Sequence, residues 1–103
     1  MALRSKNVTI TTTGTAQSVH PLSATVYHTP VKYVRLESET SNADVKVGDK
    51  NITATTYGMI LEAGPTKYKE IGPFGGGDSP FNLEDIWVIG TATQIIHILY
   101  VTL

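Results

Sequence analysis

The chain has 103 residues, a length typical of one domain, with eight basic and nine acidic residues and a formal net charge of −1. Because its Lys and Arg residues do not cluster, the sequence lacks the basic surface of a nucleic-acid-binding protein. It contains no cysteine, which excludes disulfides and thiolate metal sites, and no apolar run approaches the roughly 18 residues of a membrane span.

Most predicted elements are short strands separated by glycine and proline. Residues 1–6 precede the first alternating pattern and are predicted to form a flexible N-terminal arm. In chain order, the predicted strands span residues 6–13, 15–20, 31–37, 44–47, 59–62, 67–71, 86–89 and 95–101. Residues 23–28 stay open as either strand or loop, and residues 52–56 are predicted to be a short crossing segment. The strand at 95–101 is almost entirely apolar, so we expect it to be central and covered on both faces.

Two further segments have a different character. Residues 72–80 contain three consecutive glycines and two prolines, a composition that predicts a flexible loop. Residues 82–85 could form one helical turn. No segment shows a sustained helical period.

Together these elements predict an all-β domain. Val, Ile and Thr account for 33 residues, and β-branched side chains favour a pleated sheet. We therefore expect one domain over residues 1–103, folded as a compact antiparallel β-sandwich or jelly roll of about eight short strands, with an open barrel as the nearest alternative. The predicted core residues are Val34, Leu36, Ile86, Val88, Ile96 and Ile98.

No residue set in the sequence is typical of a catalytic or metal site. His20 and His28 are separated by Pro21, and His97 lies within an apolar strand, whereas a zinc site needs three or four converging ligands. No spacing singles out a pair among the nine carboxylates. The glycines at 75–77 are followed by Asp78 and not by the Lys-Ser or Lys-Thr step of a phosphate-binding loop. We expect no enzymatic activity, metal or cofactor.

Two stretches carry a resemblance to a known class of protein. The first is Val-x-Val-Gly…Ile-Thr-Ala…Gly…Leu-x-x-Gly, from Val45 to Gly64. The second runs from Leu83 through Asp-Ile-Trp-Val-Ile-Gly-Thr-Ala to Ile-His-Ile-Leu-Tyr at Tyr100. The order of these strands and glycine turns resembles small virion proteins of tailed bacteriophages, over roughly residues 31–101.

The resemblance implies a non-enzymatic structural protein of a phage particle, of the capsid decoration (cement) type that binds and stabilises the head shell. It implies the major capsid protein or other virion proteins as partners, a homo-oligomer such as a trimer, and a place on the head surface after synthesis in the bacterial cytoplasm. Neither nucleic acid nor membrane is an expected partner. The candidate contact residues are Met1, Ala2, Leu3, Arg4, Phe74, Gly75, Gly76, Gly77 and Trp87.

A second functional class stays open. The domain could be a β-sandwich module on the virion that binds a carbohydrate or host surface, with Trp87 as an aromatic platform. An exposed Trp87 beside open polar groups would favour this module. A buried Trp87 and extensive contacts with neighbouring chains would favour the shell protein.

Overall fold

The computed structural model describes residues 2–23, 28–39, 44–64, 67–72 and 81–103. Within these ranges the chain is built almost entirely of strands, with one short 3-10 helix, η1 (Leu83–Asp85). The strands are β1 (Leu3–Thr9), β2 (Gln17–Ser18), β3 (Pro30–Ser38), β4 (Val45–Gly48), β5 (Met59–Leu61), β6 (Tyr68–Ile71), β7 (Phe81–Asn82), β8 (Trp87–Ile89) and β9 (Ile95–Thr102).

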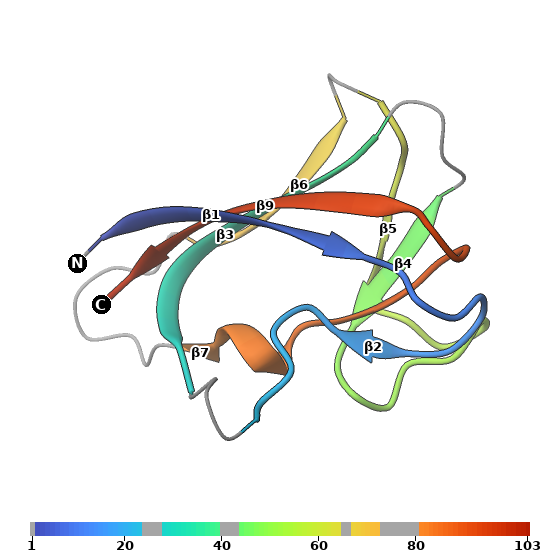
Figure 1. Cartoon of the computed structure of the whole chain (residues 1–103), viewed down its shortest axis with the longest axis horizontal. Coiled ribbons are helices and arrows are strands. Elements are labelled where there is room, and N and C mark those ends of the chain that lie inside the picture. The colour runs from blue at the N-terminus through green and yellow to red at the C-terminus, as the bar shows by residue number, and fades with distance from the viewer. Residues whose placement is uncertain (1, 24–27, 40–43, 65–66, 73–80) are drawn as a thin grey trace.

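The strands form two antiparallel sheets, and this confirms the predicted all-β sandwich. Sheet A has the order β1-β9-β3-β6, with the short β7 also paired to β3, and sheet B has the order β2-β8-β4-β5. Figure 1 shows the two layers, with both ends of the chain at the same end of sheet A. The jelly-roll form of the sandwich stays a prediction.

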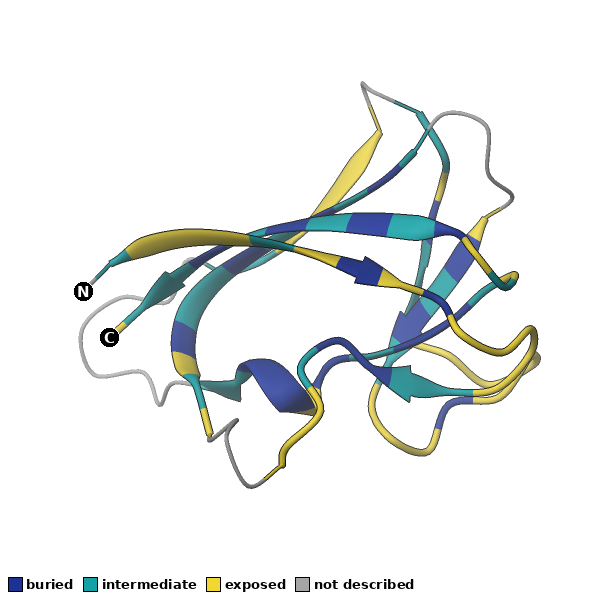
Figure 2. Cartoon of the chain, viewed as in Figure 1, coloured by how far each residue is buried: buried dark blue, intermediate teal, exposed yellow. Residues whose placement is uncertain are grey.

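The core lies between the sheets, and all six predicted core residues belong to it. Sheet A contributes residues of β1, β3 and β9, and sheet B contributes residues of β4, β5 and β8. In each long strand the buried residues alternate with residues of the opposite face (Figure 2). The alternation predicted this correctly because successive side chains of a strand point to opposite faces.

A β-bulge in β3 changes which residues face outward. Val31 pairs with Thr102 and Tyr33 pairs with Val101, so Lys32 is an extra residue on its strand. Val31 and Val34 are both buried, whereas Lys32 and Tyr33 between them are only partly covered. The bulge therefore places two consecutive side chains on the outer face of sheet A.

The prediction of a flexible N-terminal arm is wrong from Leu3 onward. Residues Leu3–Lys6 form the first half of β1 and pair with residues Ile98–Val101 of β9. Because most side chains at the start of β1 are exposed, this segment lacks the apolar alternation that marks Val8 and Ile10. Backbone pairing with β9 orders it nevertheless. The strand also ends at Thr9, four residues before the predicted end.

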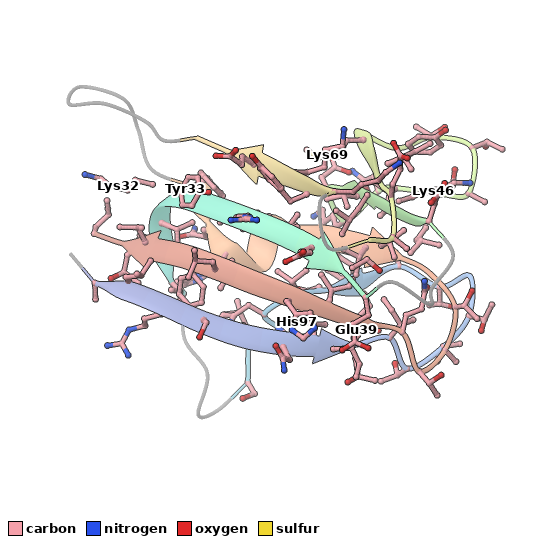
Figure 3. The ribbon with its side chains drawn as sticks, turned by 90° about the horizontal axis from the view of Figure 1, so that it is seen from above. Lys32, Tyr33, Glu39, Lys46, Lys69 and His97 are labelled. Atoms are coloured by element: carbon pink, nitrogen blue, oxygen red, sulfur yellow. The ribbon has the colours of Figure 1, made fainter. Side chains whose placement is uncertain are left out.

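The prediction that the last strand is covered on both faces is also wrong. β9 is central in sheet A, as expected, but only its inward residues are buried. Its outward residues, Ile95, His97, Leu99 and Val101, are partly exposed. The outer face of sheet A is not covered by any other element among the described residues (Figure 3).

Other boundaries differ less. The strand predicted at 15–20 is reduced to β2, and the pairing of β7 with β3 was not predicted. The helical turn predicted at 82–85 is confirmed by η1. Most of the segments predicted at 23–28 and 72–80 lies outside the described residues.

The loop between β4 and β5 folds back over the outer face of sheet B. The Ile52 side chain is buried directly above Gly48, where a Cβ atom would meet Ile52 Cγ2 at 2.2 Å. Lys46, an outward residue of β4, lies over the Tyr57 ring at 5.0 Å and donates a hydrogen bond to the Ala54 carbonyl. The two sheets thus differ: sheet B carries a packed loop on its outer side, while sheet A presents strands.

Candidate interaction surface

The outer face of sheet A is a set of cross-strand rows set by the strand register. From the end that holds both termini, the rows are Leu3–Val101–Tyr33, Ser5–Leu99–Arg35–Glu70, Asn7–His97–Glu37–Tyr68 and Thr9–Ile95. Side chains directly opposite each other on neighbouring strands lie close enough to interact. The first row is apolar, the two middle rows are mostly polar, and the last row pairs Thr9 with Ile95.

The polar end is centred on His97. Its Nδ1 lies 2.8 Å from Asn7 Oδ1, and its Nε2 lies 3.0 Å from Glu39 Oε1. The ring thus connects β1 to the residue after β3 across the central strand, and Figure 3 shows His97 and Glu39 side by side. An open depression of about 350 Å³ adjoins this cluster, and Arg35 and Glu37 contribute to its wall.

Side-chain contacts also order the middle of the face. The Arg35 guanidinium lies 4.0 Å from the centre of the Tyr68 ring, a cation–π contact between β3 and β6. Burial, together with the nearby Glu70 carboxylate, raises the pKa of Tyr33. These contacts reduce the freedom of side chains that a partner would otherwise have to order.

The terminal end is apolar. We call Leu3, Tyr33, Leu99 and Val101 the terminal apolar patch: three of them form the first row, and Leu99 is the apolar member of the second. Leu3 is 68% exposed, and Leu103, just beyond β9, is 55% exposed. Single exposed apolar residues are ordinary, but neighbouring ones on one sheet face are typical of a protein contact.

A separate polar cluster lies at the edge of the sandwich and includes two of the three histidines. Lys6 Nζ lies 3.1 Å from His20 Nδ1, and His20 Nε2 lies 3.0 Å from Thr29 Oγ1. The Thr29 backbone N–H donates to Glu84 Oε2, and Glu84 Oε1 pairs with His28. Burial lowers the pKa of Lys6.

The order of these contacts argues against a threonine nucleophile. With Lys6 as an ammonium group, which can only donate, His20 Nδ1 accepts and Nε2 carries the proton. His20 then donates to Thr29 and cannot take the hydroxyl proton as a general base. Among the described residues, no three His, Asp or Glu side chains are grouped to hold a metal ion.

Glu84 gives the cluster a pH dependence. Burial by itself would raise the pKa of the Glu84 carboxyl, but its hydrogen bonds with His28 and with backbone N–H groups, including that of Thr29, outweigh this and lower the pKa below the ordinary 4.5. A carboxylate with a lowered folded-state pKa stabilises the fold above the unfolded-state pKa, and this stabilisation is lost as the pH falls through the folded-state value.

We therefore expect the free energy of unfolding to fall as the pH drops below about 4.5, and Glu84→Gln to make this fall shallower. Urea titrations from pH 7 to pH 3 measure it. Glu62→Gln is the control, because the Lys67 ion pair that lowers the pKa of Glu62 is exposed and screened by solvent. An equally steep fall in the parent and in Glu84→Gln would contradict the assignment.

Among the described residues, the predicted contact residues lie on two different sheets. Met1, Phe74 and Gly75–Gly77 lie outside the described residues. Ala2, Leu3 and Arg4 lie at the terminal end of sheet A, where the Ala2 N–H donates to Thr102 Oγ1 at 3.1 Å. Trp87 belongs to sheet B and is half-buried, which is intermediate between the two conditions set for it.

Sequence reasoning missed the other members of the face. Leu99 and Val101 were expected to be covered, and the partners of His97 lie 90 and 58 residues away along the chain. The alternation of β9 marked these residues as one face, but only the register showed which side chains lie beside them. No helix in the described part of the chain has the length and apolar character needed to cross a membrane.

Comparison of the chain with protein-family models, curated proteins and solved structures finds no match.

Proposed function

We propose that the chain is a non-enzymatic structural protein of a tailed-phage particle, a decoration subunit that binds the assembled head and stabilises it. The observation that carries the proposal is the open outer face of sheet A, with an apolar end and an ordered polar end. The resemblance of residues 31–101 to small virion proteins is the reason for proposing a tailed-phage particle. The proposed location is the head surface, with the major capsid protein as partner.

The residues that carry the resemblance support the proposal through the fold. Gly48 lies under Ile52, and a Cβ atom at Gly90 would meet the Gln94 amide oxygen at 2.4 Å and Val45 at 3.3 Å. These glycines allow close packing in sheet B and beside it. The two stretches that carry the resemblance, Val45–Gly64 and Leu83–Tyr100, therefore contribute mainly to the packing of the fold. The outer face of sheet A is the surface that we propose for binding.

Binding to the assembled shell would stabilise it by mass action, because the subunit binds the lattice and not its separated parts. Many copies add weak contacts into a large total, and we propose a symmetric oligomer, with a trimer favoured, as the bound form. The contact surface assigned here is the terminal apolar patch.

The test adds purified protein to emptied heads made without it and measures occupancy by sedimentation. Leu3→Glu places a charge in the terminal apolar patch, and we expect it to weaken binding about tenfold or more, since burying a charge without a partner is costly. Leu22→Glu is the matched control, because Leu22 is also exposed but lies in the loop after β2. It should decorate heads as the parent does.

Two outcomes would contradict the proposal at different levels. Equal occupancy by Leu3→Glu and Leu22→Glu would show that the patch is not the contact surface. If undecorated heads withstand heating and low salt as well as decorated ones, the stabilising role is wrong.

A further inference from the structure

Trp87 lies on the opposite sheet from the proposed head contact. Its cross-strand partners are Ser18 in β2 and Gly48 in β4. Both are small, so neither neighbouring strand places a large side chain over the indole. Trp87 remains half-buried and forms part of the wall of a depression of about 230 Å³.

Four other residues line the depression, and the fold positions each of them. Asp85 is the last residue of η1 and lies two positions before Trp87. Asp49, Lys50 and Asn51 form the start of the β4–β5 loop. The Asn51 N–H donates to Asp49 Oδ1 at 2.8 Å, and the Ile52 N–H donates to the Asp49 carbonyl at 3.2 Å. These two bonds and the buried Ile52 hold the loop beside the indole.

The groups that line the depression can both donate and accept hydrogen bonds. The Trp87 indole N–H and the side chains of Lys50, Asn51 and Asp85 make no hydrogen bond or ion pair with any residue that the structure describes. The indole and the ammonium group donate, the carboxylate accepts, and the amide does both. An aromatic surface with a few convergent polar groups is the usual composition of a small-molecule site.

We propose that this depression binds a neutral sugar ring. The C–H face of a pyranose is apolar and stacks on an indole, while its hydroxyls donate and accept hydrogen bonds as the surrounding side chains do. The lining includes two carboxylates and one ammonium group, so it is net negative and disfavours phosphates, nucleotides and acidic sugars. The depression is open to solvent and small, with a volume of about 230 Å³, so we expect it to hold a single ring and not an extended ligand.

This inference does not rest on head binding. The depression belongs to sheet B and the terminal apolar patch to sheet A, so one can fail while the other stands. If both hold, the particle-bound subunit would present a sugar-binding site on the sheet away from the shell.

The chain contains a single tryptophan, so its intrinsic fluorescence reports directly on the site. The probes are glucose, galactose, mannose and N-acetylglucosamine with their short oligomers, alongside glucuronate and AMP. We expect a saturable change in emission with at least one neutral sugar, and weaker or no binding of the two anionic probes. No response to any neutral probe, or tighter binding of glucuronate or AMP, would overturn the proposal.

Variants then locate the site. Asn51→Ala removes the side-chain amide, and Asp85→Asn replaces one acceptor oxygen with an NH2 donor and removes the charge. Both positions are exposed, and we expect each variant to weaken binding about threefold to tenfold. Trp87→Phe keeps a ring but loses the N–H, and its binding is measured by calorimetry. Asn7→Ala, on the outer face of sheet A, is the control and should bind as the parent does. Unchanged affinity in both Asn51→Ala and Asp85→Asn would contradict the site even if Trp87 variants fail to fold.

Discussion

Truncating Ile98 to Ala should lower the free energy of unfolding by about 2–5 kcal/mol. Ile98 lies in the middle of the central strand β9, is 2% exposed, and pairs with Lys6 of β1 and Leu36 of β3. This cost has two contributions: the lost transfer free energy of the removed carbon atoms and the cavity that they leave behind. Because a small domain has only about 5–15 kcal/mol of stability in total, this single change removes a large fraction of it.

Urea denaturation of both proteins measures the effect, with the midpoint shifting and the slope unchanged. Leu99→Ala is the matched control, since Leu99 is the next residue of the same strand but faces outward. It should cost less than about 1 kcal/mol. If Leu99→Ala costs as much as Ile98→Ala, the register of β9 is shifted by one residue or the outer face is covered.

We expect the second large effect from Gly48→Ala, which should lower the free energy of unfolding by about 1–3 kcal/mol. The new Cβ atom would lie 2.2 Å from Ile52 Cγ2, far inside contact distance, and the buried Ile52 cannot move without shifting the loop over sheet B. Gly48 has an ordinary negative or extended φ, so the cost comes from the contact and not from the backbone conformation.

A double-mutant cycle separates this contact from other causes. Ile52→Ala removes the Cγ2 atom, after which the nearest Ile52 atom to the new methyl group is Cβ at 3.7 Å, an ordinary contact. Gly48→Ala should therefore cost less in the Ile52→Ala background, with a coupling of about 0.5–3 kcal/mol. Some cost remains in both backgrounds, because the Gly58 backbone nitrogen lies 3.2 Å from the new methyl group. Strict additivity would show that Ile52 does not limit this position.

Strand β4 and the loop after it show what the local sequence pattern can predict and what it cannot. The alternating residues Val45 and Val47 correctly predict a strand with one buried face, because the two-residue period follows from strand geometry alone. The same pattern cannot show that Ile52 folds back over Gly48, since this depends on the path of the loop. The glycine therefore looks like a turn residue in sequence, although packing is what requires it.

The sequence alone determined the fold class and the inward face of each long strand. β-Branched composition, two-residue alternation and frequent turn residues act locally, so Val34, Leu36, Ile96 and Ile98 could be placed in the core without knowing which strands pair. The spacing of histidines and carboxylates predicted no catalytic or metal site, and local pattern could not show how the outward residues are grouped.

Only the tertiary structure decided which outward residues become neighbours. Leu3 orders as a strand because β9 lies beside it, and His97 meets Asn7 and Glu39 because β9 lies between β1 and β3. Trp87 stays partly open because Ser18 and Gly48 lie opposite it. Each of these placements depends on pairing between residues far apart in the chain, and local periodicity carries no information about such pairing.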